Sequence, residues 1–133
     1  MNTQRFIISV IAVFIFTFVY GFIVHGHLMM PMYLQTQGVW RSMAEMSTLM
    51  PWSIGTGIAL AAAISFLFTR HYEGRGLHEG LRFGLYVGLI MGLVQFGAYT
   101  YLPIPLNLAL AWLVVYTIEG IGIGLVLSLT YKA

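Results

Sequence analysis

One glutamate, Glu119, lies near the centre of an apolar stretch that covers about residues 108–130. Placing an ionised carboxylate at the centre of a bilayer costs about 2.5 to 3.5 kcal/mol on insertion scales. None of the apolar stretches in the chain contains a lysine or arginine that would pair with it. We therefore expect Glu119 to face the interior of a helix bundle, either protonated or next to a polar side chain.

The candidate partners of Glu119 are polar side chains expected at a similar depth. Gln95 is the first candidate, and the others are Tyr116, Tyr99, Thr17 and Tyr20. Two interpretations of Glu119 stay open. It is either a site that couples to protons or cations, or a neutral carboxylic acid that only holds helices together by hydrogen bonds. The substitution Glu119→Gln separates these interpretations.

A second group of residues with binding chemistry follows the first apolar stretch: His25, His27, Met29, Met30 and Met32. Imidazole suits copper and zinc, and thioethers select Cu(I), so the group is reasonable for copper handling. Residues two apart on a helix point in nearly opposite directions, so His25 and His27 chelate one ion only where the chain is extended. The alternative is that the histidines lie at the membrane interface and the methionines fill packing gaps. No other cofactor is expected.

Four long apolar stretches must position these residues. The chain has 133 residues, of which 59% are hydrophobic and only 8% are charged, whereas soluble domains carry about 25% charged residues. A helix that crosses a bilayer needs about 20 apolar residues. We predict an all-α integral membrane four-helix bundle, a single transmembrane domain over residues 1–133. Its spans cover about residues 6–24, 51–68, 83–102 and 108–130.

The connection between the first two spans has the pattern of a short amphipathic helix in the membrane interface. Apolar residues recur there at steps of four, three and four: Val39, Met43, Met46 and Met50. Arg41 and Glu45 are four residues apart on another face and are candidates for an ion pair. We therefore predict an interfacial helix within residues 32–50.

The basic residues predict the orientation of the chain. Five of them fall on one side of a four-span topology: Arg5, Arg70, Arg75, Arg82 and Lys132. Only Arg41 falls on the other side. The positive-inside rule then places both termini in the cytoplasm of a bacterial cell, with the protein in the inner membrane. Residues 70–82 are expected to form a solvated connector that fixes this topology.

Small residues at steps of four predict close helix packing. Gly84, Gly88 and Gly92 form the most regular series, and Gly120 and Gly124 form another in the last span. Small faces let helix backbones approach each other in lipid, where burial of apolar side chains gives no driving force. These faces either pack the bundle internally or dock a second subunit. We expect a homo-oligomer or association with other membrane subunits, in addition to contact with the lipid bilayer.

Several function classes have no support in the sequence. The chain lacks cysteine, which excludes disulfides and thiolate metal sites. It has no Ser/His/Asp set, no His-Glu-x-x-His motif and no paired carboxylates, so we expect it not to be an enzyme. A net charge of +2, with its basic residues dispersed, indicates no nucleic-acid partner.

Two stretches, residues 80–88 and 119–124, resemble small four-helix bacterial inner-membrane proteins that remain uncharacterised, and this resemblance implies no mechanism. Small multidrug transporters are similar in size and in number of spans. They carry a membrane-embedded glutamate in the first helix, where this chain has no acidic residue. Here the only acidic residue within a span is Glu119, in the fourth.

Two hypotheses of function follow. The leading one is a small non-enzymatic membrane protein, an accessory or structural subunit that associates with itself or joins a larger complex. The alternative is a proton-coupled or copper transport or handling protein. It would use Glu119 within the membrane and His25, His27 and the nearby methionines at the outer mouth.

Overall fold

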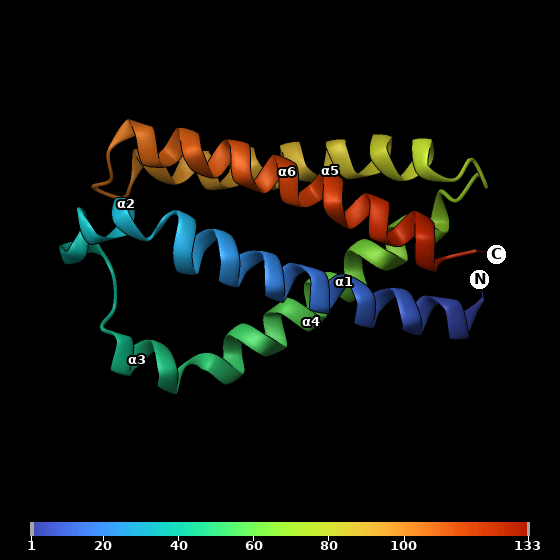
Figure 1. The fold of residues 1–133 in the computed structure, drawn as a ribbon, viewed down its shortest axis with the longest axis horizontal. Helices are drawn as coiled ribbons and strands as arrows, with labels where there is room; N and C mark the ends of the chain where they lie inside the picture. The colour runs from blue at the N-terminus through green and yellow to red at the C-terminus, as the bar shows by residue number, and fades with distance from the viewer. Residues whose placement is uncertain (1, 133) are drawn as a thin grey trace.

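The computed structural model describes residues 2–132, and this part of the chain is helical and contains no strand. Four helices are long and apolar enough to cross a membrane: α1 (Thr3–Ile23), α4 (Met50–Arg70), α5 (Leu77–Gly97) and α6 (Leu106–Thr130). They run up and down in a bundle, with both ends of the chain at the same end (Figure 1). The predicted fold class, a four-helix membrane bundle, is confirmed.

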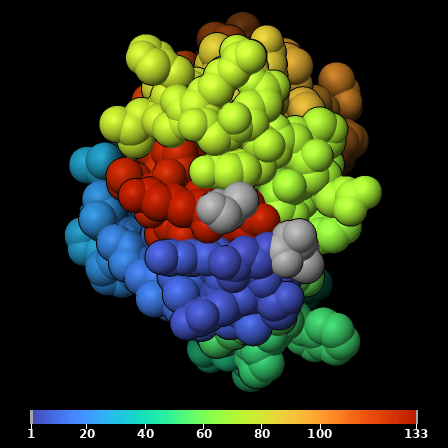
Figure 2. Space-filling view, turned by 90° about the vertical axis from the view of Figure 1, so that its right-hand side faces the viewer, coloured from blue at the N-terminus to red at the C-terminus, as the bar shows by residue number. Residues whose placement is uncertain are grey.

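The ends of the bundle differ in construction. At one end, which we call the terminal end, the start of α1 lies beside the end of α6 and near the loop over residues 71–76 (Figure 2). The backbone N–H of Asn2 donates to the Tyr131 hydroxyl there, and Ser9 and Thr130 share a hydrogen bond of 2.9 Å. The other end, the connection end, holds residues 24–49 and the turn between α5 and α6 (Figure 1).

The predicted interfacial helix is not continuous. Its residues are divided among α2 (Met30–Leu34), a 3₁₀ turn (Gln37–Val39) and α3 (Met43–Thr48). Trp40 is extended, and Ser42 begins α3 with a capping box, in which its side chain accepts from the N–H of Glu45. The predicted apolar stripe is therefore split among the 3₁₀ turn, α3 and the start of α4, and Met43, Met46 and Met50 are exposed.

The loop between α4 and α5 is exposed over most of its residues, as expected of a solvated connector, and it is also ordered by hydrogen bonds. Glu79, in the first turn of α5, is buried, and its carboxylate accepts from the backbone N–H of Glu73 at 2.6 Å and of Arg75 at 2.8 Å. The Glu73 carboxylate pairs with Arg75 and Arg82 at 2.9 and 3.1 Å. Gly76 immediately precedes α5 with a φ of 66°, which glycine adopts without strain. Helix α5 therefore begins six residues before the span predicted from residue 83.

Helices α5 and α6 form the most extensive contact in the molecule. A Cβ added to Gly84 or Gly88 would collide with the backbone oxygen of Gly120 or Thr117, and one added to Gly124 would collide with that of Gly80. The helix backbones are therefore in direct contact along this face, as small residues permit in lipid. The glycines at steps of four in α5 and α6 therefore pack against each other within one chain.

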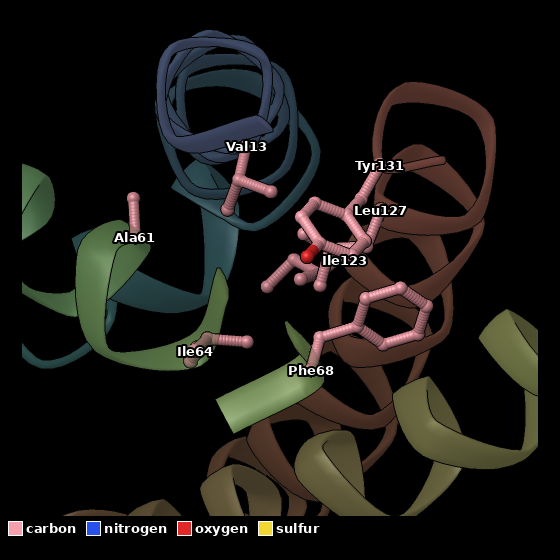
Figure 3. Close-up of a cluster of buried hydrophobic side chains, with 7 residues drawn as sticks. All are labelled: Val13, Ala61, Ile64, Phe68, Ile123, Leu127 and Tyr131. Carbon is pink, nitrogen blue, oxygen red and sulfur yellow. The ribbon is translucent and has the colours of Figure 1, made fainter. Parts of the chain in front are cut away.

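Two buried clusters show how α4 departs from the bundle. The first joins α1, α4 and α6 in the terminal half, where seven side chains converge: Val13, Ala61, Ile64, Phe68, Ile123, Leu127 and Tyr131 (Figure 3). The second lies toward the connection end and includes Val24, Leu108 and Trp112, but no residue of α4. The first half of α4 therefore diverges from the other helices, as its oblique path in Figure 1 shows.

The outer surface of the bundle is apolar. Large side chains such as Phe18 and Phe22 of α1, Ile90 and Val94 of α5, and Ile118 of α6 are exposed. A surface of this kind is suited to the hydrocarbon interior of a bilayer, because lipid chains solvate apolar side chains that water does not.

Candidate functional site: a cavity within the membrane span

The divergence of α4 leaves a cavity of about 580 Å³ between α1, α4 and α6. Its polar lining comes from all three helices: Thr17 and His25 from the α1 side, Ser53 and Thr56 from α4, and Tyr116 and Glu119 from α6. His25, Trp52 and Leu49 lie toward the connection end, whereas Val13, Ile64 and Glu119 lie near the middle of the bundle. The cavity therefore runs from the connection end to the membrane centre.

Glu119 is the only acidic residue that lines this cavity. It lies halfway along α6 and is 7% exposed. Within residues 2–132, no hydrogen bond or ion pair reaches its carboxylate. Tyr20 and Tyr116 lie within electrostatic range of it, but the Tyr20 hydroxyl donates to the backbone oxygen of Val115 at 2.6 Å.

The structure does not join Gln95 to Glu119. Gly92 packs against Leu113 and Gly88 against Thr117, so Gln95 lies beyond Leu113 toward the start of α6. By this register it is about two helical turns from the level of Glu119. Gln95 does not line the cavity, and Tyr99, in the 3₁₀ turn after α5, is 43% exposed. Of the predicted partners, Tyr116 and Thr17 share the cavity with Glu119.

A polar network closes the cavity wall at the connection end. The chain leaves α1 in a π-helical segment, Val24–Leu28, a form that is frequent at functional sites. This segment turns the half-buried His25 ring inward, 5.4 Å from the Tyr116 ring between centroids. Nδ1 of His25 lies 2.6 Å from the Tyr33 hydroxyl. The oxygen of that hydroxyl accepts from the Trp112 indole N–H at 2.9 Å.

Tyr33 is half-buried, and this affects the acidity of its hydroxyl. Burial raises the pKa of its hydroxyl, and the hydrogen bond from Trp112 acts in the opposite direction. The hydroxyl therefore keeps its proton at neutral pH and has it available for Nδ1 of His25 or for the Met29 sulfur, 3.8 Å away. This network holds α2 against α6 at the mouth of the cavity.

The predicted copper group is not gathered at one point. His25 faces the cavity, whereas His27 is exposed and packs against Phe22, with ring centroids 4.8 Å apart. Met29 is buried and Met30 is exposed, and Met32 packs at the edge of the second cluster. The segment is helical, so the two imidazoles diverge, and residues 2–132 contain no group of three or more His, Cys, Asp or Glu placed for a metal ion.

Several residues of the site had no signal in the sequence. Tyr33 and Trp112 are 79 residues apart, and their hydrogen bond depends on how α2 folds back onto α6. Trp52 and Thr56 belong to no motif in the sequence. They line the cavity because α4 crosses the bundle obliquely, and a single helix pattern does not encode a crossing angle.

Comparison with known proteins adds no further constraint. No protein-family model matches the chain, and no match is found among the curated proteins or the solved structures. The functional argument therefore rests on the cavity and its residues.

Proposed function

We propose that this chain binds a proton or a cationic solute at Glu119, as a transport or solute-handling protein of the membrane. The observation that supports the proposal is the Glu119 carboxyl, which lines a cavity of about 580 Å³ without a hydrogen-bond or ion-pair partner among residues 2–132. Functional carboxylates in membrane spans face such cavities.

The need for a balancing charge is the physical reason why Glu119 would bind a proton or a cation. An ionised carboxylate at mid-membrane needs a positive counterpart, because the low dielectric makes an isolated charge costly. The described part of the cavity offers no lysine or arginine, and Nδ1 of its one histidine, His25, is engaged by the Tyr33 hydroxyl at 2.6 Å. The counterpart is then a proton or a cation that enters the cavity. Copper is a weaker candidate, since only His25 of the predicted copper group lines the cavity.

We infer that the cavity opens toward the exterior of a bacterial inner membrane. Arg5, Lys132 and the three arginines of residues 70–82 belong to the terminal end, and only Arg41 belongs to the connection end. The positive-inside rule makes the terminal end cytoplasmic. The mouth near His25 then faces outward.

Carbodiimide labelling tests this function. Dicyclohexylcarbodiimide partitions into membranes and modifies protonated carboxyl groups, and the chain has only four acidic residues to compare. We expect Glu119 to be modified in native membranes, and the rate to fall as the pH is raised. Mass spectrometry of the digested protein locates the label, and Glu119→Gln is expected to abolish it.

The matched control is Glu45, an exposed glutamate outside the four long helices. Glu45→Gln is expected to leave labelling of Glu119 unchanged. A chain that carries no label on Glu119 under any condition, while the reagent modifies other membrane carboxyls in the same sample, contradicts the proposal.

A second candidate function is a self-associating membrane subunit, and one observation favours it. The small residues Gly55, Ala59 and Ala63 of α4 are exposed, and no atom lies within 4 Å of a Cβ added at Gly55. This series has an exposed face, whereas those of α5 and α6 pack against each other. Such faces support close association of helices in lipid.

Disulfide trapping tests that candidate, because the chain has no cysteine of its own. Ala59→Cys is expected to form a covalent dimer in membranes under mild oxidation. The control is Leu85→Cys, which places the thiol on an exposed position of α5. Equal trapping at both positions, or none at Ala59→Cys, contradicts association through α4.

A further inference from the structure

We propose that the ligand of the Glu119 cavity is an amphiphilic primary amine, whose ammonium group binds Glu119 and whose apolar tail lies between α1 and α4. This inference rests on the proposed function and specifies the class of solute. Three features of the cavity lead to it: its size, the kind of polar atoms it presents, and an apolar groove that joins it.

The cavity is larger than a bare ion requires. Its volume of about 580 Å³ falls within the range of about 300 to 1,000 Å³ typical of small-molecule sites. One water molecule occupies about 30 Å³ of liquid. A proton or a metal ion would leave most of this space to water next to largely apolar walls, so an organic ligand fits the space better.

Three side chains of the wall offer acceptor oxygens to a ligand: Glu119, Thr17 and Thr56. The Thr17 hydroxyl donates its hydrogen to the backbone oxygen of Phe14 at 3.0 Å, and the Thr56 hydroxyl donates to that of Trp52 at 2.8 Å. Each hydroxyl has one hydrogen, so both keep only lone pairs for a ligand. Glu119 adds two acceptor oxygens when ionised. The complement of such a wall is a positively charged group with several N–H donors.

An apolar groove continues from the cavity. A second hollow of about 350 Å³ lies between α1 and α4 and shares Thr17, Gly21, Ser53 and Gly57 with the first. Phe18 and Phe22 line it and are 55% and 63% exposed, so it faces the lipid. An alkyl or aryl tail placed there would be solvated by aromatic rings and by lipid chains. A ligand whose charged group lies in the cavity can therefore place its tail in this groove between α1 and α4.

These features distinguish among amphiphiles with the same tail. A primary ammonium carries three N–H donors for carboxylate and hydroxyl oxygens. A trimethylammonium carries the same charge but no donor. An alcohol carries a donor but no charge. The carboxylate of Glu119 and the free lone pairs of Thr17 and Thr56 predict that the primary amine binds most tightly.

The test uses the whole chain in nanodiscs of phosphatidylcholine, with one cysteine introduced at a cavity position. Ser53→Cys places a thiol in the wall common to both hollows. The matched control is Ser47→Cys, an exposed position on α3 that lines neither. The rate of maleimide labelling is measured against the concentration of octylamine, octyltrimethylammonium or octanol.

Octylamine is expected to slow labelling of Ser53→Cys but not of Ser47→Cys. Octyltrimethylammonium and octanol are each expected to need about tenfold higher concentration for the same protection. Equal protection by octylamine and octyltrimethylammonium overturns the donor argument. Protection by octanol at the concentration of octylamine overturns the role of charge, and absence of protection by octylamine overturns the proposal.

Adding Glu119→Gln to Ser53→Cys is expected to weaken the protection by octylamine about tenfold or more, while Glu45→Gln has no effect. A Glu119→Gln variant that does not fold leaves the comparison of the three probes in the Ser53→Cys chain as the deciding result. If Glu119 is modified by carbodiimide but octylamine gives no protection, the amine proposal fails and the proposed function stands. If both results are negative, both fail.

Discussion

The Tyr33 hydroxyl lies 2.6 Å from Nδ1 of His25, and this contact joins α2 to the last turn of the first span at the mouth of the cavity. The same oxygen accepts from the Trp112 indole N–H of α6. One hydroxyl therefore connects three segments that are distant in sequence, and it fixes the position of a histidine that lines the cavity.

Replacing Tyr33 by Phe is expected to destabilise the protein by about 1 to 3 kcal/mol, because the buried Trp112 N–H is left without an acceptor. The thermal unfolding midpoint in mild detergent measures this loss. Trp112→Phe in the Tyr33→Phe background is expected to cost less than Trp112→Phe alone. Full additivity of the two changes contradicts the hydrogen bond.

Replacing Gly88 by Ala is expected to separate α5 from α6, since the new Cβ would collide with the backbone oxygen of Thr117. Overpacking of this kind costs about 1 to 3 kcal/mol, and backbone has little freedom to yield. Gly97→Ala is the control on the same helix, because no atom lies within 4 Å of its added Cβ. Equal thermal unfolding midpoints for the two variants would contradict direct contact between the α5 and α6 backbones at Gly88.

Replacing Glu79 by Gln is expected to loosen the loop between α4 and α5. Its two carboxylate oxygens accept from the backbone N–H groups of Glu73 and Arg75, and an amide retains only one acceptor oxygen. We expect a loss of about 1 to 3 kcal/mol and faster hydrogen exchange at these two amides. Glu73→Gln removes only exposed ion pairs and is expected to cost under about 1 kcal/mol. Equal effects from the two variants contradict this role of Glu79.

The start of α3 is expected to be pH-dependent. Hydrogen bonds from the Ser42 backbone N–H and then from its hydroxyl hold the pKa of Glu45 below its ordinary value of 4.5, and Arg41 acts in the same direction. A lowered pKa in the folded state means that the cap is fully effective above pH 4.5 and is lost as the pH falls through the folded-state pKa. Carbon-13 titration of Glu45 is expected to show its pKa move upward in Ser42→Ala but not in Ser47→Ala. An unchanged pKa in Ser42→Ala contradicts the capping box.

The four spans could be predicted because lipid imposes a simple condition. A segment of about 20 apolar residues must satisfy its own backbone, and a helix does so. The ends of the spans were less predictable. Helix α5 begins at Leu77 because the Glu79 carboxylate closes the preceding loop, a contact that depends on where the loop folds.

The connection between α1 and α4 shows where periodicity was misleading. The spacing of Val39, Met43 and Met46 suits a helix, but spacing says nothing of whether the backbone between them is continuous. Ser42 and Glu45 form a capping box, which begins a new helix inside the expected one. This capping pattern is visible in the sequence as Ser-x-x-Glu, and it indicates a new helix start at Ser42.

The site was predictable in its charged residue and not in its neighbours. Glu119 stood out because a carboxylate within a span is rare. Depth along the spans predicts Gln95 as its partner, but the glycine contacts set a register that places the two about two turns apart. The cavity depends on the path of α4 and on the π-helical turn at His25, which are properties of the packed bundle.

The most direct test of the central claim, that Glu119 binds a positive charge, is the carbon-13 signal of its own carboxyl group. The chain has four acidic residues, so selective labelling of glutamate gives few signals, and Glu119→Gln identifies the one of interest. We predict that octylamine, added at constant pH in nanodiscs, moves the Glu119 signal to the position of an ionised carboxylate and leaves Glu45 and Glu79 unchanged. A Glu119 signal that responds neither to octylamine nor to a change of pH would contradict the account.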